Sequence, residues 1–141
     1  KAVRDTRLRL YPKHTLIVAL YGQGKTRGQV SELLIEATTN QACASLVFNG
    51  EAEHLRTYTK IFLIKNYREM RLLAEGGAQP NLNLNKIKQM LIPIPPLAEQ
   101  ERIVAKVEQL LSLCDALESR LWEAREARGR LVESVLVGVG G

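Results

Sequence analysis

The sequence has few of the residues that build metal centres, disulfide frameworks or catalytic sites. Only two cysteines and two histidines occur among its 141 residues. Cys43 and Cys114 lie in unrelated contexts, without a CxxC motif or Cys/His spacing, so neither a disulfide framework nor a zinc site is indicated. His14 and His54 have no partners at metal or triad spacing, and they are typical of surface or turn positions. The sequence therefore predicts no metal site and no catalytic residue.

Long apolar runs are missing as well. A membrane-spanning helix needs about 20 predominantly apolar residues, and no uncharged run of that length occurs. The first residues, from Lys1 to Thr6, do not have the pattern of a signal peptide. We therefore expect a soluble, cytoplasmic protein with no membrane partner.

Acidic residues are scarce in the first part of the chain. Up to Pro96 there are fourteen Lys or Arg and seven Asp or Glu, a balance of +7, whereas six basic and eight acidic residues follow from Leu97, a balance of −2. A body this basic is expected to bind a polyanion, most simply nucleic acid. The two parts of the chain are therefore expected to have different roles.

Proline is concentrated at the start of a predicted long helix. Pro93, Pro95 and Pro96 keep the backbone extended, and a helix is predicted from Leu97 to about Val137, roughly 60 Å long. Along it, apolar residues recur at steps of four and three. This heptad seam consists of Ile103, Val107, Leu110, Cys114, Leu117, Leu121, Ala124, Arg128, Leu131 and Val135, with Arg128 as its one charged member. Val104, Leu111 and Val132 widen it on one flank. The pattern predicts pairing with a partner helix rather than an isolated helix in water.

The remainder reads as an α+β body. Strands are expected at 15–21, 44–48 and 90–94, and 30–36 is ambiguous between strand and helix. A turn is expected at Asn49-Gly50. Helices are expected from 51 to about 74, with a break near Asn66 and an end at Gly76-Gly77, and from 86 to 89, with an asparagine as its cap. The predicted fold class is thus a small mixed α/β domain followed by one long helix.

One segment resembles a phosphate-binding loop. Residues 19–26, Ala-Leu-Tyr-Gly-Gln-Gly-Lys-Thr, match GxxxxGK[ST] except for alanine in place of the first glycine. The missing glycine is the one that opens the turn, and no apolar strand ending in aspartate follows to hold a magnesium ion. An NTPase therefore stays a distant alternative.

Polar loops are the better candidates for function. Gln23, Lys25, Thr26, Arg27 and Gln29 offer charged and amide donors on a backbone that glycines allow to approach a ligand closely. Polar clusters at 38–41 and 79–81 are similar in kind. Each cluster taken alone is also typical of an ordinary solvated loop.

The stretch from Pro93 to Leu111, PIPPLAEQERIVAKVEQLL, followed by CDALE at 114–118, closely resembles the conserved region of the specificity subunit of type I restriction–modification enzymes. Upstream, residues 21–28, 37–43 and 79–82 resemble the target recognition domain that precedes that region. The resemblance covers nearly the whole chain. It implies a recognition domain at 1–96 and a conserved-region helix at 97–141.

The resemblance also implies the function. Such subunits have no catalytic centre; each recognition domain reads one half of a bipartite DNA target, and the long helices form an antiparallel coiled coil that sets the distance between the halves and docks methyltransferase subunits. No cofactor is expected on this chain, because S-adenosylmethionine and ATP with magnesium belong to the modification and restriction subunits. The residues expected to contact double-stranded DNA are Tyr21, Gln23, Lys25, Thr26, Arg27, Gln29, Thr39, Asn40, Gln41, Gln79 and Asn81.

The chain departs from the full family pattern, because a complete specificity subunit has two recognition domains and two such helices. We expect a fragment or a natural half-subunit, and two copies would then pair through the seam. Trp122 lies off the seam, where it is either a lone surface aromatic or an anchor for the methyltransferase. Arg128 marks either looser packing or control of the pairing register. The alternative function is a coiled-coil scaffold that does not read DNA.

Overall fold

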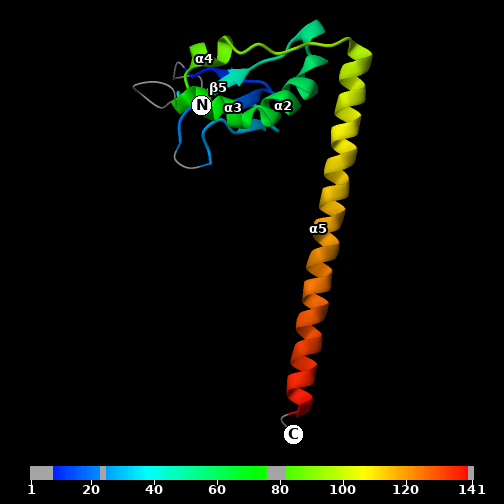
Figure 1. Ribbon diagram of the computed structural model, residues 1–141. Helices are drawn as coiled ribbons and strands as arrows, with labels where there is room; N and C mark the ends of the chain where they lie inside the picture. Colours follow the sequence, from blue (N-terminus) through cyan, green and yellow to red (C-terminus); the bar gives the residue numbers. More distant parts are fainter. Residues whose placement is uncertain (1–7, 23–24, 76–81, 140–141) are drawn as a thin grey trace. The chain divides into compact units, whose positions relative to one another are not determined.

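The computed structural model describes residues 8–22, 25–75 and 82–139, with side chains up to residue 72 and from 82 to 133. The chain divides into two compact units, Lys1–Gln100 and Glu101–Gly141, which are described separately (Figure 1). The domain boundary predicted between Pro96 and Leu97 stays a prediction.

The first unit is built on a three-stranded antiparallel sheet with β2 (Leu16–Ala19) at its centre. β3 (Val30–Glu32) and β5 (Cys43–Leu46) flank β2, with Val18 paired to Val30 on one side and to Ala44 on the other. The strand predicted at 15–21 is confirmed in a shorter form, and so is the strand predicted at 44–48. The ambiguous stretch 30–36 begins as a strand, because pairing with β2 satisfies its backbone groups.

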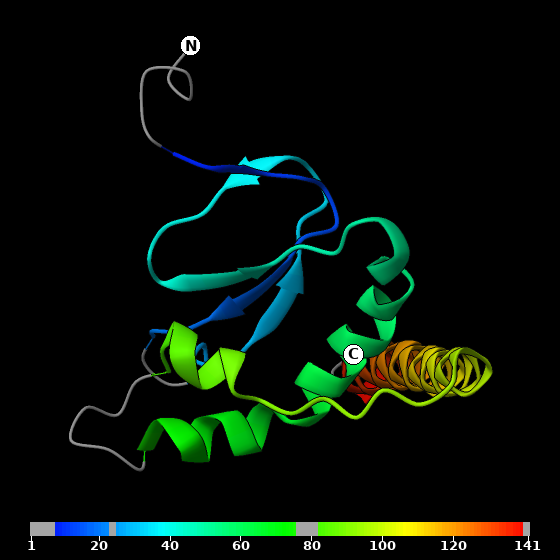
Figure 2. The ribbon, with the colours of Figure 1, turned by 90° about the horizontal axis from the view of Figure 1, so that it is seen from above.

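A second sheet has only two short strands, β1 (Leu10–Tyr11) and β4 (Ala37–Thr38), which pair antiparallel. The sequence did not predict it, because two-residue strands show no periodicity that a sequence pattern could reveal. Its function here is to bring the segment before β2 beside the segment that leads into β5 (Figure 2).

The helical region agrees with the prediction apart from its start. Residues from 51 do not begin an α-helix: a short 3₁₀ turn, η1 (Gly50–Ala52), precedes α2 (Leu55–Lys65). The predicted break is confirmed at Asn66, where α2 ends and α3 (Tyr67–Glu75) begins. The end predicted at Gly76-Gly77 lies outside the described residues.

The next helix, α4 (Leu84–Lys88), starts two residues earlier than predicted. Its asparagine cap is confirmed, because the Asn83 side chain accepts a hydrogen bond from the Lys86 amide at 2.9 Å. An N-terminal cap of this kind satisfies a helical N–H group that has no partner within the helix.

One hydrophobic core joins the sheet to the helices. Its buried members come from β2 and its exit, from β5, from α2 and α3, and from the segment before α4: Val18, Leu20, Ala44, Leu63, Met70 and Leu82. Val30, Leu46, Ile87 and Met90 pack against them. Val18 and Leu20, two residues apart, therefore share the face that packs against the helices, as expected for an extended chain whose side chains alternate between two faces.

The strand predicted at 90–94 is wrong. Residues Met90 to Ile94 join no strand, because a strand needs a neighbouring partner and proline has no N–H to donate. Side chains hold this extended segment instead. The Tyr58 hydroxyl donates to the Pro93 carbonyl at 2.9 Å, and the buried Gln100 side chain donates to the Pro95 carbonyl at 2.8 Å.

The long helix α5 (Leu97–Val139) begins at the predicted residue and ends two residues later than predicted. The amides of Glu99 and Gln100 donate to the Pro96 carbonyl, at 2.9 and 3.1 Å. Its 43 residues correspond to roughly 65 Å. The predicted α+β class with one long helix is thus confirmed (Figure 1). Among the residues that the structure describes, no helix combines the length and apolar character needed to span a membrane.

Candidate nucleic-acid interface

The sheet topology brings two of the predicted polar segments to the same place. β2 is antiparallel to both of its neighbours, so its C-terminal end lies beside the starts of β3 and β5. The Gly28 amide donates to the Ala19 carbonyl at 2.9 Å, and the Leu20 amide donates to the Ala42 carbonyl at 2.8 Å. Loop 25–29 and turn 39–42 therefore lie on opposite sides of the exit of β2.

Two glycines shape the loop. Gly22 has a φ angle of 143°, and a β-carbon there would lie 3.0 Å from the β-carbon of Thr26. Gly28 has a φ angle of 81°, and a β-carbon there would lie 3.5 to 3.7 Å from side-chain atoms of Tyr67, Met70 and Leu82. The positive φ at Gly28 favours glycine, and its position holds the second half of the loop against the core.

The loop and the turn expose most of the predicted contact residues. The exposed residues on the loop side are Tyr21, Lys25, Thr26 and Gln29. On the turn they are Asn40 and Gln41. Thr39 is half-buried, with its hydroxyl 3.1 Å from that of Ser45. Asn40 uses its side-chain oxygen to accept a hydrogen bond from the Ala42 amide at 3.0 Å, which shapes the turn. Three other predicted residues, Gln23, Gln79 and Asn81, lie outside the described residues.

Arg27 differs from its exposed neighbours. Its side chain is half-buried, and the guanidinium donates to the Gly22 carbonyl at 3.4 Å. Its Nε is buried and has no hydrogen-bond partner among the described atoms. In this structure Arg27 therefore braces the loop from within, whereas Lys25 presents the loop's exposed positive charge.

Tyr67, at the start of α3, is a positioning residue that the sequence did not indicate. Its hydroxyl donates to the Lys25 carbonyl, and Arg71 in turn donates to that hydroxyl at 3.1 Å. The Arg71 guanidinium also lies 5.6 Å from the centre of the Tyr67 ring. The contact joins residues 42 positions apart, so no local pattern could have revealed it.

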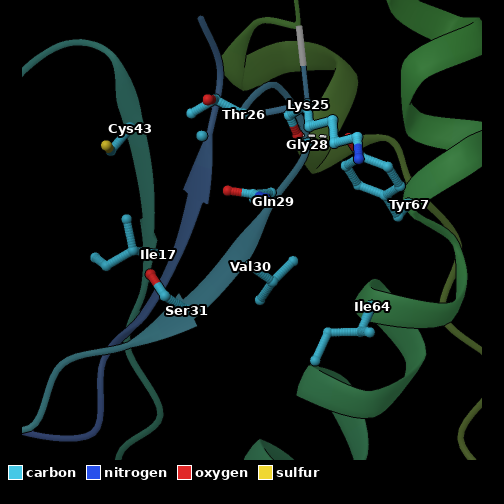
Figure 3. Close-up of a pocket in the computed structure, with 11 residues that line it drawn as sticks. Ile17, Lys25, Thr26, Gly28, Gln29, Val30, Ser31, Cys43, Ile64 and Tyr67 are labelled. Atoms are coloured by element: carbon cyan, nitrogen blue, oxygen red, sulfur yellow. Dashed lines mark hydrogen bonds between the residues drawn. The ribbon is translucent and has the colours of Figure 1, made fainter. Parts of the chain in front are cut away.

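The loop borders a hollow of about 780 Å³. Figure 3 shows Lys25, Gln29 and Tyr67 around it, together with the apolar side chains of Val30 and Ile64. Its full lining is Ile17, Ala19, Lys25, Thr26, Gly28, Gln29, Val30, Ser31, Cys43, Ile64 and Tyr67. The hollow thus combines apolar walls with a few polar groups that come from the loop, β3 and α3.

The other end of the sheet carries an ionic cluster. Glu32 accepts hydrogen bonds from Lys60 at 2.9 Å and His14 at 2.8 Å, and Arg56 lies 3.6 Å away. The hydrogen bond from Lys60 lowers the pKa of Glu32, against the effect of burial, and His14 and the nearby charges contribute in the same direction. His14 is thus a structural turn residue with a φ angle of 70°.

Among the described residues, no three His, Cys, Asp or Glu side chains form a group that could hold a metal ion.

The phosphate-loop alternative fails on topology. A phosphate-binding loop connects a strand to the N-terminus of a helix, whose amides hold the phosphates. Here the loop after β2 leads into β3, which pairs with β2. The loop is therefore a connection between antiparallel strands.

Comparison with known proteins identifies the family. Residues 3–124 match the family described as the type I restriction modification DNA specificity domain. The chain belongs to this family. The membership confirms the resemblance seen in the sequence.

Curated relatives agree with the family. The chain is 34% identical over 82 residues to the type I restriction enzyme EcoAI specificity subunit of Escherichia coli, which covers 53% of this chain and 14% of that protein. It is 32% identical over 93 residues to the EcoKI specificity subunit of Escherichia coli strain K12, covering 66% and 19%. For the StySPI specificity subunit of Salmonella potsdam the identity is 34% over 64 residues, covering 45% and 14%. The matched region thus spans less than a fifth of the length of these relatives.

Proposed function

We propose that this chain reads one half of a bipartite DNA target through the surface formed by loop 25–29 and turn 39–42. The observation that carries the proposal is that the topology gathers the exposed Lys25 and Gln29 of the loop and the exposed amide side chains of the turn at the exit of β2. Membership of a DNA specificity family supports the proposal that this surface contacts DNA. We term this surface the loop–turn surface.

The side chains on this surface suit two different contacts. Lys25 is exposed and is suited to a phosphate oxygen, which positions the protein without reading sequence. Gln29, Asn40 and Gln41 have amide groups that donate and accept, as hydrogen bonds to base edges in the major groove require. Gly22 and Gly28 have the positive φ angles that give the loop its shape.

We further propose that α5 docks the chain onto a second conserved-region helix and onto modification and restriction subunits. The exposed seam supports this, with Leu117, Leu121 and Leu131 exposed by 58%, 62% and 66%. Trp122, exposed by 68%, is the proposed anchor for a methyltransferase subunit. Methyl transfer from S-adenosylmethionine and ATP-driven steps would then belong to the partner subunits.

The test is selection of duplexes from a randomised pool by the chain with a cognate modification subunit, at two salt concentrations. We expect a short sequence motif. Lys25→Ala should weaken binding to the selected duplex and lower the slope of log affinity against log salt by about 1, because one phosphate contact is lost.

Lys13→Ala is the matched control, because Lys13 is exposed just before β2, at the opposite end of the sheet from the loop–turn surface. It should leave both quantities unchanged. Salt-sensitive binding without a motif would favour the scaffold alternative, and an effect of Lys13→Ala equal to that of Lys25→Ala would move the DNA contact away from the loop–turn surface.

A further inference from the structure

Tyr21 places an exposed aromatic ring on the loop–turn surface. It follows Leu20, which is buried in the core, and 46% of its own surface is exposed. All seven aromatic residues of the chain lie within the part that the structure describes, and the other five of the first unit are buried or half-buried. An exposed aromatic ring among polar groups marks a contact surface, because its apolar area gains from leaving water.

Gln41 is a near neighbour of Tyr21 on this surface. The Leu20 amide donates to the Ala42 carbonyl at 2.8 Å, and Tyr21 and Gln41 are each one residue away from this hydrogen bond. Both side chains are exposed. The exit of β2 therefore delivers the ring, and turn 39–42 delivers the amide, to the same part of the loop–turn surface.

The Gln41 amide has its hydrogen-bonding capacity available. Within the part of the chain that the structure describes, no hydrogen bond engages the Gln41 side chain. Asn40 differs, because its side-chain oxygen accepts from the Ala42 amide at 3.0 Å. A glutamine amide whose oxygen and nitrogen are both open can donate and accept at once, and this is the pattern that pairs bidentately with adenine.

Among its described residues, the loop–turn surface offers little for reading a G·C pair. Guanine is most often read by arginine or lysine, and cytosine by a carboxylate. Residues 21–29 and 39–42 contain no Asp or Glu. Arg27 is half-buried, and its guanidinium donates to the Gly22 carbonyl at 3.4 Å. Lys25 is exposed, and a phosphate oxygen is the contact proposed for it above.

An A·T pair presents a different row of groups in the major groove. Adenine offers its N7 acceptor and its N6 amino donor, and thymine offers its O4 acceptor and its C5-methyl group. An amide side chain donates to N7 and accepts from the N6 amino group. The methyl group is the apolar member of the row, so it gains from an apolar contact. Tyr21 and Gln41 together match both ends of this row, with the ring for the methyl group and the amide for adenine.

We propose that the loop–turn surface reads an A·T base pair, with the Tyr21 ring against the C5-methyl group of thymine and the Gln41 amide on adenine. This assignment rests on the proposed function, because it names the bases that the proposed DNA surface selects. Thymine and uracil differ only in this methyl group, and both pair with adenine. Tyr21 therefore distinguishes thymine from deoxyuridine, whereas Gln41 responds to the edge of adenine.

The test uses the duplex selected from the randomised pool, with the full chain and its modification subunit. Each thymine of the selected motif is replaced in turn by deoxyuridine. At one position we expect the affinity to fall roughly fourfold, because one methyl group loses its apolar contact. Replacing the adenine of the same pair by 7-deazaadenine, which lacks the N7 acceptor but still pairs with thymine, should lower the affinity roughly fivefold.

Variants assign these two effects to side chains. Tyr21→Ala should bind the thymine and deoxyuridine duplexes equally, whereas Tyr21→Phe keeps the ring and should retain the roughly fourfold difference. Gln41→Ala should abolish the effect of 7-deazaadenine and keep the effect of deoxyuridine. Lys13→Ala is again the control and should retain both effects. Circular dichroism checks that each variant keeps the fold.

Three results would each overturn the proposal: a selected motif without an A·T pair, deoxyuridine tolerated at every position, or a Tyr21→Ala variant that still distinguishes thymine from deoxyuridine. These results are distinguishable from a failure of the proposed function. A motif whose binding depends on Lys25 but not on a thymine methyl group removes only the assignment of Tyr21 and Gln41. The absence of any selected motif removes the proposed function and this assignment together.

Discussion

Tyr67→Phe removes a single hydroxyl that joins α3 to loop 25–29. That hydroxyl donates to the Lys25 carbonyl and accepts from Arg71. A hydrogen bond of this kind contributes about 1 kcal/mol net, which is roughly fivefold in an equilibrium constant. The phenylalanine ring keeps the packing against Gly28, where a β-carbon would be 3.5 Å away. We therefore expect the loop to be less firmly held, while its charge and its contact with the core persist.

The expected result is a roughly fivefold loss of affinity for the selected duplex, with an unchanged dependence on salt. Lys25→Ala should differ, because it lowers the salt slope. Fluorescence anisotropy at four or five salt concentrations separates the two effects. Tyr58→Phe is a matched control, since it removes a hydroxyl that donates to Pro93 at 2.9 Å and does not contact the loop.

Two results would refute this reasoning. If Tyr67→Phe binds the selected duplex as tightly as the unchanged chain, Tyr67 does not set the geometry of the loop for DNA. If Tyr58→Phe weakens binding to the same extent, the loss reflects general destabilisation. A change in salt slope with Tyr67→Phe would show that the variant has displaced Lys25 itself.

Two further predictions concern stability. The lowered pKa of Glu32 means that its carboxylate stabilises the fold above the ordinary value of 4.5, and that this contribution is lost as the pH falls through the lowered pKa. Glu32→Gln should therefore lower the unfolding free energy by about 1 kcal/mol at pH 7. In urea titrations, the unfolding free energy of the variant should also fall less steeply below about pH 5. Parallel pH profiles for the two proteins would contradict this. Gly28→Ala should cost about 1–2 kcal/mol, because its φ of 81° is unfavourable to other residues although the nearest contact of the new methyl group is an ordinary 3.5 Å. Gly129→Ala in α5 is the control, because a β-carbon there would have nothing within 4 Å, and it should stabilise the helix by up to about 1 kcal/mol. If Gly28→Ala and Gly129→Ala lost the same amount of stability in thermal unfolding, the role assigned to the φ angle of Gly28 would be excluded.

Features that depend on neighbouring residues were predictable from the sequence. The start of α5 follows from Pro93, Pro95 and Pro96, which prevent a helix before Leu97. The break at Asn66 and the cap at Asn83 are likewise local effects of backbone hydrogen bonding. The order of the polar loops and the PPLAEQ stretch was enough to indicate the family.

Strand pairing was less predictable, because it depends on partners far along the chain. The stretch 90–94 has an apolar composition that suits a strand, but no neighbouring strand pairs with it. The stretch from Val30 is a strand because its backbone pairs with the edge of β2. The short pair β1 and β4 likewise exists only through tertiary contact.

The sequence by itself determined the long helix, its heptad seam and the composition of the polar loops, because proline geometry, helical periodicity and turn chemistry act over a few residues. Only the tertiary structure decided that loop 25–29 and turn 39–42 flank the exit of β2, that Arg27 turns inward while Lys25 stays exposed, and that Tyr67 holds the loop. These contacts join residues distant in sequence through a shared sheet and core. Their geometry exists only once the chain has folded.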